Sequence, residues 1–265
     1  MTSSTAPQLP AALALISDPQ VRTLSARLLR YLAEDDYGSH PVAIVEQAAR
    51  SLVELGTKRL PGTALVREVA PEGMDNVQAV LEVITDDMPF LVASVTNALS
   101  AAGRTVRLVV HPQLVVRRDA DGRLVEIVDS DVDEDLPADA LAESWMWIEL
   151  ERDYASAGLP AVEDRVRSVL RDVRVAVRDW RAMRSKAVIL AEEIVAFPPA
   201  GLPPEMIDEG VHLLRWLADD NLTFLGYREY RLATEAGEDV LVPVSGSGLG
   251  ILSPDVQPDS ASSRS

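Results

Sequence analysis

Between residues 77 and 118, the pattern of apolar and polar positions predicts a strand, a helix and a second strand. The first strand has β-compatible residues and ends at the polar residues 85–87. Apolar residues then recur at helical spacing as far as Gly103, a typical helix stop: Phe90, Leu91, Val95, Ala98, Leu99 and Ala102. A second strand over residues 106–110 ends before Pro112, because proline cannot donate to a sheet ladder. This stretch is therefore predicted to be a β-α-β unit.

The turn between the first strand and the helix carries two adjacent carboxylates. We expect Asp86 or Asp87 to cap the exposed amides of the helix, and Pro89 to lie in the first helical turn, where its missing N–H costs nothing. Neighbouring side chains in a turn point in different directions. The pair is therefore placed for capping rather than for acid–base catalysis.

Two amphipathic helices are predicted ahead of this unit. Asp18 followed by Pro19 is typical of a helix start, and a second apolar stripe covers residues 42–56. Together they form an expected helical hairpin over residues 18–60. A disordered tail is expected over residues 1–17.

Further strands and helices are predicted on both sides of the β-α-β unit. Residues 64–70 suit an extended segment or an edge strand, and the Asp-Gly pair at 121–122 is a hairpin-turn signal. Residues 143–152 suit a central strand covered on both faces, and residues 162–180 and 182–195 suit two helices.

The order of these elements defines the expected fold class. It is α+β, with a βαββα arrangement close to the plan of ferredoxin-like modules, in which the last strand is not evident. That strand is either missing or supplied from elsewhere. Open edges of such a sheet would pair readily with another copy.

A proline-rich run at residues 197–204 is the strongest domain boundary in the sequence. It separates an α/β domain over residues 61–197 from the start of a second α/β module over residues 203–253. The elements expected in that module are a helix over 205–218 and strands over 222–232 and 240–244. A disordered tail is expected over residues 254–265.

Composition narrows the possible partners. The net charge is −17, which repels nucleic-acid phosphates and anionic membranes, so neither is expected as a partner. There is no cysteine, which excludes disulfides and thiolate chemistry. The start of the chain lacks the basic residues of a signal peptide, and no apolar run is long enough to span a membrane. A cytoplasmic location is the expectation.

Candidate catalytic and metal-binding groups are few. The acidic residues 129–139 lack the glycine and final glutamate of a calcium loop, which favours a disordered, solvated loop. The glycines at 246, 248 and 250 have the wrong spacing for a dinucleotide-binding turn. The three histidines and two lysines are dispersed and carry no paired ligand or base. We therefore expect no catalytic residues, no metal site and no activity from this chain alone.

Three sequence blocks carry a resemblance to a known family. They are DDMPFLVASVTNAL with RLVVHPQ at residues 86–113, HLLRWLADDNLTFLGYREYRL at residues 212–232, and GSGLGIL at residues 246–252. In the same order, they resemble the amino-terminal regulatory part of the very large bacterial NAD-dependent glutamate dehydrogenases. That family carries ACT-type modules, small ferredoxin-like units that often bind amino acids.

The resemblance implies a role for the turn at residues 86–89. In such modules an amino acid commonly binds where the first strand meets the first helix, so Asp86, Asp87, Met88 and Pro89 are the candidate ligand-binding residues. The aspartates could hold an α-ammonium group. Ala93 stands where relatives usually carry an acidic residue, and a purely structural cap is the competing interpretation.

Three functions follow as hypotheses. The first is a non-catalytic regulatory and assembly region of a dehydrogenase that converts L-glutamate, NAD and water to 2-oxoglutarate, ammonium and NADH. NAD then belongs to the parent enzyme, and the partners are the rest of that chain, further copies and an amino-acid effector. The alternatives are a ligand-free oligomerisation module and a stand-alone amino-acid-binding sensor.

Overall fold

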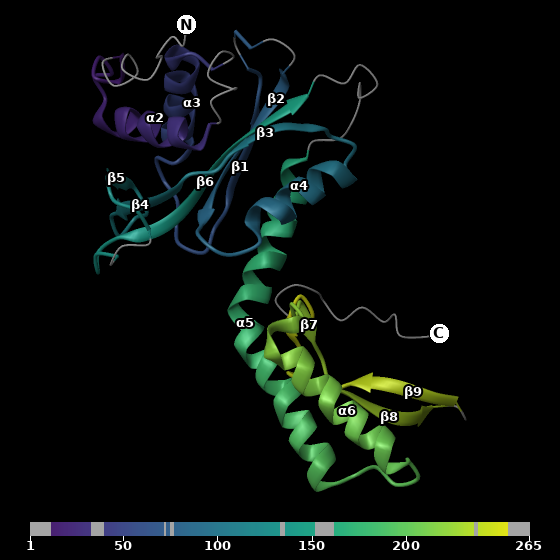
Figure 1. The fold of residues 1–265 in the computed structure, drawn as a ribbon. Coiled ribbons are helices and arrows are strands. Elements are labelled where there is room, and N and C mark those ends of the chain that lie inside the picture. Colours follow the sequence, from purple (N-terminus) through teal and green to yellow (C-terminus); the bar gives the residue numbers. More distant parts are fainter. Residues whose placement is uncertain are drawn as a thin grey trace, which may run out of the picture. The chain divides into compact units, whose positions relative to one another are not determined.

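A computed structural model of the chain describes residues 12–32, 40–71, 73–74, 77–132, 136–151, 162–235 and 238–253. The chain divides into two compact units, residues 1–170 and 171–265. Each unit has its own sheet structure (Figure 1).

The first unit is built on a six-stranded antiparallel sheet. Its strands are β1 (Leu65–Val69), β2 (Val77–Asp86), β3 (Val106–Val110), β4 (Gln113–Arg118), β5 (Leu124–Val128) and β6 (Leu141–Glu151). They lie in the order β1-β2-β6-β4-β5, and β3 also pairs with β6. The predicted edge strand at 64–70 is confirmed as β1, and the predicted turn at 121–122 joins β4 to β5.

Strands β3 and β4 behave as one long strand with an interruption. Val110 lies opposite Trp147 and Gln113 lies opposite Ser144, so both strands run along the same side of β6. The break between them falls at His111 and Pro112, as the missing N–H of proline predicts.

Helices α2 (Pro19–Tyr31) and α3 (Val42–Leu55) cover one face of this sheet (Figure 1). The predicted cap is confirmed, because the Asp18 carboxylate accepts from the amides of Gln20 (2.9 Å) and Val21 (3.2 Å). Their apolar stripes meet alternate strand residues in one core. Its buried members include Leu24, Leu28, Leu52, Val80, Ile84, Leu114, Trp145 and Trp147.

The opposite face of the sheet packs against α4 (Leu91–Ala101), as Figure 1 shows. The strand residues of the other parity, such as Leu81 and Met146, are fully buried, as are Val95 and Leu99 of α4. Both faces of β2 and β6 are therefore covered, which explains why the two strands contain so few exposed positions.

One long helix replaces two predicted ones. Helix α5 runs without interruption from Glu163 to Ala196, so the predicted break near residue 181 is wrong. The physical reason is that no glycine or proline occurs between these ends to stop the helix.

The second unit continues from α5 into α6 (Pro204–Trp216) and a π-helical turn (Leu217–Asn221). Four short strands follow: β7 (Gly226–Tyr227) pairs with β10 (Leu249–Gly250), and β8 (Tyr230–Glu235) pairs with β9 (Glu238–Pro243). The predicted strand over 222–232 is therefore wrong in extent, because residues 228–229 interrupt the strand structure between β7 and β8. The predicted partner strand is confirmed as β9.

Some predicted segments fall partly or wholly outside the described residues. Residues 1–11 and 254–265 of the two predicted tails do so. Within the first predicted tail, Ile16 is buried in the core. None of the helices in the described ranges combines the length and apolar character that crossing a membrane requires.

Gly56 offers a test of how closely α3 packs on the sheet. A Cβ at this position would lie 2.5 Å from Cη2 of the buried Trp145. Gly56→Ala should therefore lower the free energy of unfolding by about 1–3 kcal/mol through overpacking. Urea unfolding of the first unit measures the change. Gly210→Ala, where nothing lies within 4 Å, should leave that transition unchanged, and an equal loss in both variants would contradict the packing described.

Candidate functional site

The turn that joins β2 to α4 does not have the geometry predicted from the sequence. Helix α4 begins at Leu91, and its cap residue is Phe90, which has a left-handed backbone (φ 72°) and no side-chain capping bond. Pro89 therefore precedes the helix. The prediction that Asp86 or Asp87 caps α4 is wrong, because both carboxylates bind other partners.

Asp86 ties the end of β2 to the segment that follows α3. Its Oδ1 accepts from Arg59 Nη2 (2.8 Å), and its Oδ2 accepts from the Gly62 amide (2.9 Å). The guanidinium of Arg59 is fully buried. Asp86 is therefore a structural anchor for the loop that contains Gly62.

Asp87 ties the same turn to β4 and β6. Its carboxylate accepts from Gln113 Nε2 (3.0 and 2.9 Å) and from Ser144 Oγ (2.6 Å). Burial lowers the pKa of the nearby His111, against the opposing effect of the Asp87 charge. Met88 is half-buried and Pro89 is exposed. An α-ammonium group at this turn would have to compete with donors that already occupy both carboxylates.

Sequence reasoning missed the most unusual polar feature of the first unit. Glu82, Glu143 and Glu149 are all fully buried, and they lie on the sheet face covered by α2 and α3. We call these three residues the carboxylate layer. A signal was available, since Glu143 and Glu149 share the strand parity of the core residues Trp145 and Trp147.

Glu143 lies at the centre of the best-satisfied part of the carboxylate layer. It accepts from Arg59 (3.0 and 2.7 Å), from Arg118 (2.6 and 2.9 Å) and from Trp145 Nε1 (2.9 Å). Burial acts to raise the pKa of Glu143, but the hydrogen bonds and charges of the two arginines outweigh it and lower that pKa. Glu143 is thus held ionised.

Glu149 connects the sheet to the residues just ahead of α3. Its Oε1 lies 2.6 Å from His40 Nε2, and Arg107 Nη1 donates to its Oε2 (3.1 Å). Trp147 Nε1 makes a longer contact of 3.4 Å. His40 is itself buried, so this contact fixes the start of α3 on β6.

Glu82 is the least satisfied member of the carboxylate layer. Arg67 Nε donates to its Oε2 (2.8 Å), and Arg67 also reaches Ser51 of α3. The second carboxylate oxygen is buried without a hydrogen-bond partner among the described residues. Burial accordingly raises the pKa of Glu82, against the opposing effects of Ser51 and Arg67.

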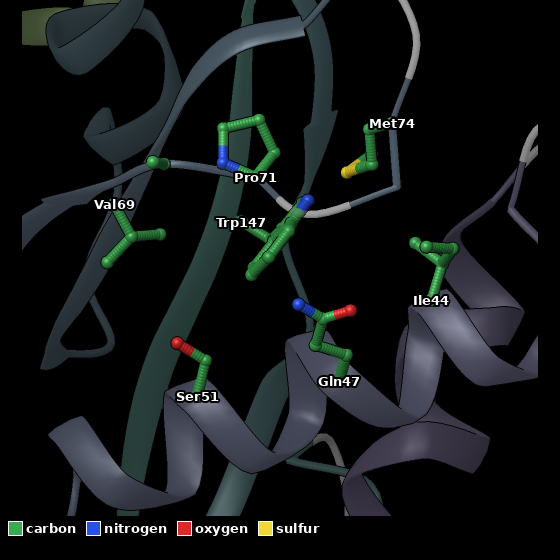
Figure 2. Close-up of a pocket in the computed structure, with 8 residues that line it drawn as sticks. Ile44, Gln47, Ser51, Val69, Pro71, Met74 and Trp147 are labelled. Atoms are coloured by element: carbon green, nitrogen blue, oxygen red, sulfur yellow. The ribbon is translucent and has the colours of Figure 1, made fainter.

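A small pocket lies between α3 and the segment that follows β1. Figure 2 shows Trp147 between Pro71 on one side and Gln47 on the other, with the Ser51 side chain reaching from α3 toward the same space. The pocket holds about 80 Å³. Ligand pockets usually hold about 300 Å³ or more, so its size suits a few waters better than an amino-acid effector.

The remaining candidate chemical groups are dispersed. Across the described ranges, no three His, Cys, Asp or Glu side chains converge as a metal site would require. Lys186 pairs with Glu229 (2.8 Å), and His212 lies exposed on α6. The described residues after Gly250 form turns rather than a helix.

The helices and the antiparallel sheet of the first unit confirm the predicted α+β class, and polar side chains tie its elements together. Residues 24–166 match the family model described as glutamate dehydrogenase, ACT1 domain. This match covers more than half of the chain. The chain therefore belongs to that family, and it corresponds to an amino-terminal region of NAD-specific glutamate dehydrogenases.

Curated relatives agree with the family match. The NAD-specific glutamate dehydrogenase of Halomonas elongata is 36% identical over 195 residues, which is 72% of this chain and 12% of the relative. The Pseudomonas aeruginosa enzyme of the same name is 35% identical over 181 residues, 68% of this chain and 11% of the relative. The Mycobacterium tuberculosis enzyme is 28% identical over 199 residues, with shares of 75% and 12%. The chain thus matches about one eighth of each relative.

The opposite pKa shifts in the carboxylate layer predict opposite effects of removing the charge. The lowered pKa of Glu143 contributes stability above its unfolded value of 4.5, and this is lost as pH falls through the folded pKa. The raised pKa of Glu82 contributes stability below 4.5, and this is lost as pH rises through the folded pKa. At neutral pH, Glu143→Gln should therefore lower the free energy of unfolding and Glu82→Gln should raise it.

Urea unfolding across pH 3–8 measures both differences. The difference for Glu82→Gln should shrink as pH falls through the raised pKa of Glu82, and the difference for Glu143→Gln should begin to shrink only below pH 4.5, because the folded pKa of Glu143 is lowered. Arg67 still has a carboxylate partner in Glu82→Gln, because its Nη1 lies 3.6 Å from Oε2 of Glu54. Shifts of the same sign at neutral pH would contradict the assignment.

Proposed function

We propose that this chain is a non-catalytic regulatory and assembly region of an NAD-dependent glutamate dehydrogenase. The parent reaction would convert L-glutamate, NAD and water to 2-oxoglutarate, ammonium and NADH. The family match and the relatives support this assignment. The observation that carries the non-catalytic role is that the buried glutamates of the carboxylate layer are engaged in structural contacts, Glu143 with Arg59 just after α3 and Glu149 with His40 just before it.

The strand order supports an ACT-type, ferredoxin-like core. Strand β2, helix α4, the interrupted strand β3–β4, strand β6 and helix α5 follow the βαββα plan in order. The strand expected last in that plan would lie beside the first. In this chain β1, which precedes β2 in sequence, pairs with β2 at that edge. We infer that β1 takes the place of the strand that the sequence leaves unassigned.

The contacts of the turn at residues 86–89 favour assembly over amino-acid sensing. Both aspartates accept hydrogen bonds from the protein itself, and the pocket beside Trp147 is small. Sensing is the second candidate function, because the resemblance implies an amino-acid site where the first strand of an ACT-type module meets its first helix. The partners in either case would be the remainder of the dehydrogenase chain and other copies of it, and NAD would bind elsewhere in that chain.

Thermal unfolding with a panel of amino acids separates these two roles. The panel contains glutamate, aspartate, arginine and the branched aliphatic amino acids. A ligand at a hundredfold excess over its Kd would add about 2.7 kcal/mol of stability, which is a rise of several degrees for a domain of this size. Because the turn is internally bonded, we expect no amino acid to raise the Tm.

A selective rise that disappears in Asp87→Asn would contradict this expectation and establish sensing at the turn. Asp164→Asn, at a position that is 97% exposed and far from the turn in sequence, is the matched control. The same samples should form no NADH from glutamate and NAD, and NADH formation would contradict the non-catalytic assignment.

A further inference from the structure

Strand β1 lies at one edge of the first unit's sheet, where backbone groups are normally open to another strand. Among the strands that the structure describes, it pairs with β2 alone. Alternate residues of such a strand turn their N–H and C=O groups outward, and an exposed row of these groups is a template for strand addition. A second copy of β1 would be an obvious partner, because two identical edges can pair about a twofold axis.

Two side chains from the first turns of α5 occupy this edge. The Glu68 amide donates to Glu163 Oε1 (2.9 Å), and Arg167 Nη2 donates to the Val66 carbonyl (2.5 Å). Glu163 and Arg167 also approach each other (3.4 Å). A carboxylate therefore meets an outward N–H, and a guanidinium meets an outward C=O, at two alternate residues of the same strand.

The surroundings hold these side chains in place. Val162 and Val166, on the same turns of α5, are buried and anchor the start of the helix. Arg104, which is 9% exposed, pairs with the Glu68 side chain (3.1 Å). Each contact on β1 involves an ionised partner, and such hydrogen bonds are stronger than neutral ones.

We propose that Glu163 and Arg167 are a guard that closes the β1 edge to strand addition by a second copy of this chain. The first turns of α5 then block the outward backbone groups of β1 in addition to packing on the sheet. Copies of the protein that associate would have to do so through surfaces other than the β1 edge. The proposal rests on the backbone contacts of β1 and not on the proposed dehydrogenase role.

The test compares the double variant Glu163→Ala/Arg167→Ala with the unchanged chain by sedimentation velocity over a range of concentrations. Loss of the guard should add a concentration-dependent species of about twice the mass that the unchanged chain shows. Asp164→Ala is the matched control, since Asp164 pairs with Arg167 (2.9 Å) but makes no contact with β1 among the described residues. Its mass distribution should equal that of the unchanged chain.

A second measurement keeps the test independent of folding defects. Hydrogen exchange of the Glu68 amide at low concentration should become about tenfold faster in Glu163→Ala, the change expected from one charge-assisted hydrogen bond. Glu163→Gln keeps an acceptor oxygen without the charge, so its Glu68 amide should exchange at a rate between those of Glu163→Ala and the unchanged chain. The guard would be refuted if the double variant sedimented like the unchanged chain, or if Asp164→Ala associated equally.

Discussion

The first unit depends on one constraint, which is that the three glutamates of the carboxylate layer are fully buried between the sheet and the helices. An unpaired buried charge is so unfavourable that each of these groups must have a donor or a proton. The donors come from distant parts of the sequence: Arg59 and His40 flank α3, and Arg67 lies on β1. The position of α3 on the sheet is therefore fixed by charge as well as by apolar packing, and a shift of the helix would leave carboxylates unpaired.

Most of the buried or partly buried carboxylates in the first unit already accept hydrogen bonds from the protein. In the described residues, the aspartates of the β2–α4 turn and two of the three buried glutamates are satisfied by the protein itself. These carboxylates hold neighbouring segments of the first unit together. The family match and the relatives place the chain in an amino-terminal region of much longer NAD-specific glutamate dehydrogenases.

Sequence patterns predicted those parts of the fold that local physics determines. The Asp18 cap, the two amphipathic helices and the turn at Gly122 each depend on residues close in sequence. The β2–α4 turn was predicted wrongly because tertiary donors compete for the same aspartates. The strand parity of Glu143 and Glu149 indicated the core face, but their hydrogen-bond partners could not be predicted, because these lie up to 109 positions away in the sequence. The pairing of β1 with β2 was not predicted, because the residue pattern of 64–70 indicates a strand but does not specify the strand that it pairs with.

Native-state hydrogen exchange tests most directly whether the carboxylate layer locks α3 to the sheet. If it does, amides of α3 should open only together with those of β2 and β6, at the same free energy and with the same denaturant dependence. If α3 instead exchanges at a distinctly lower free energy while β2 and β6 remain protected, the carboxylate layer does not hold α3 on the sheet.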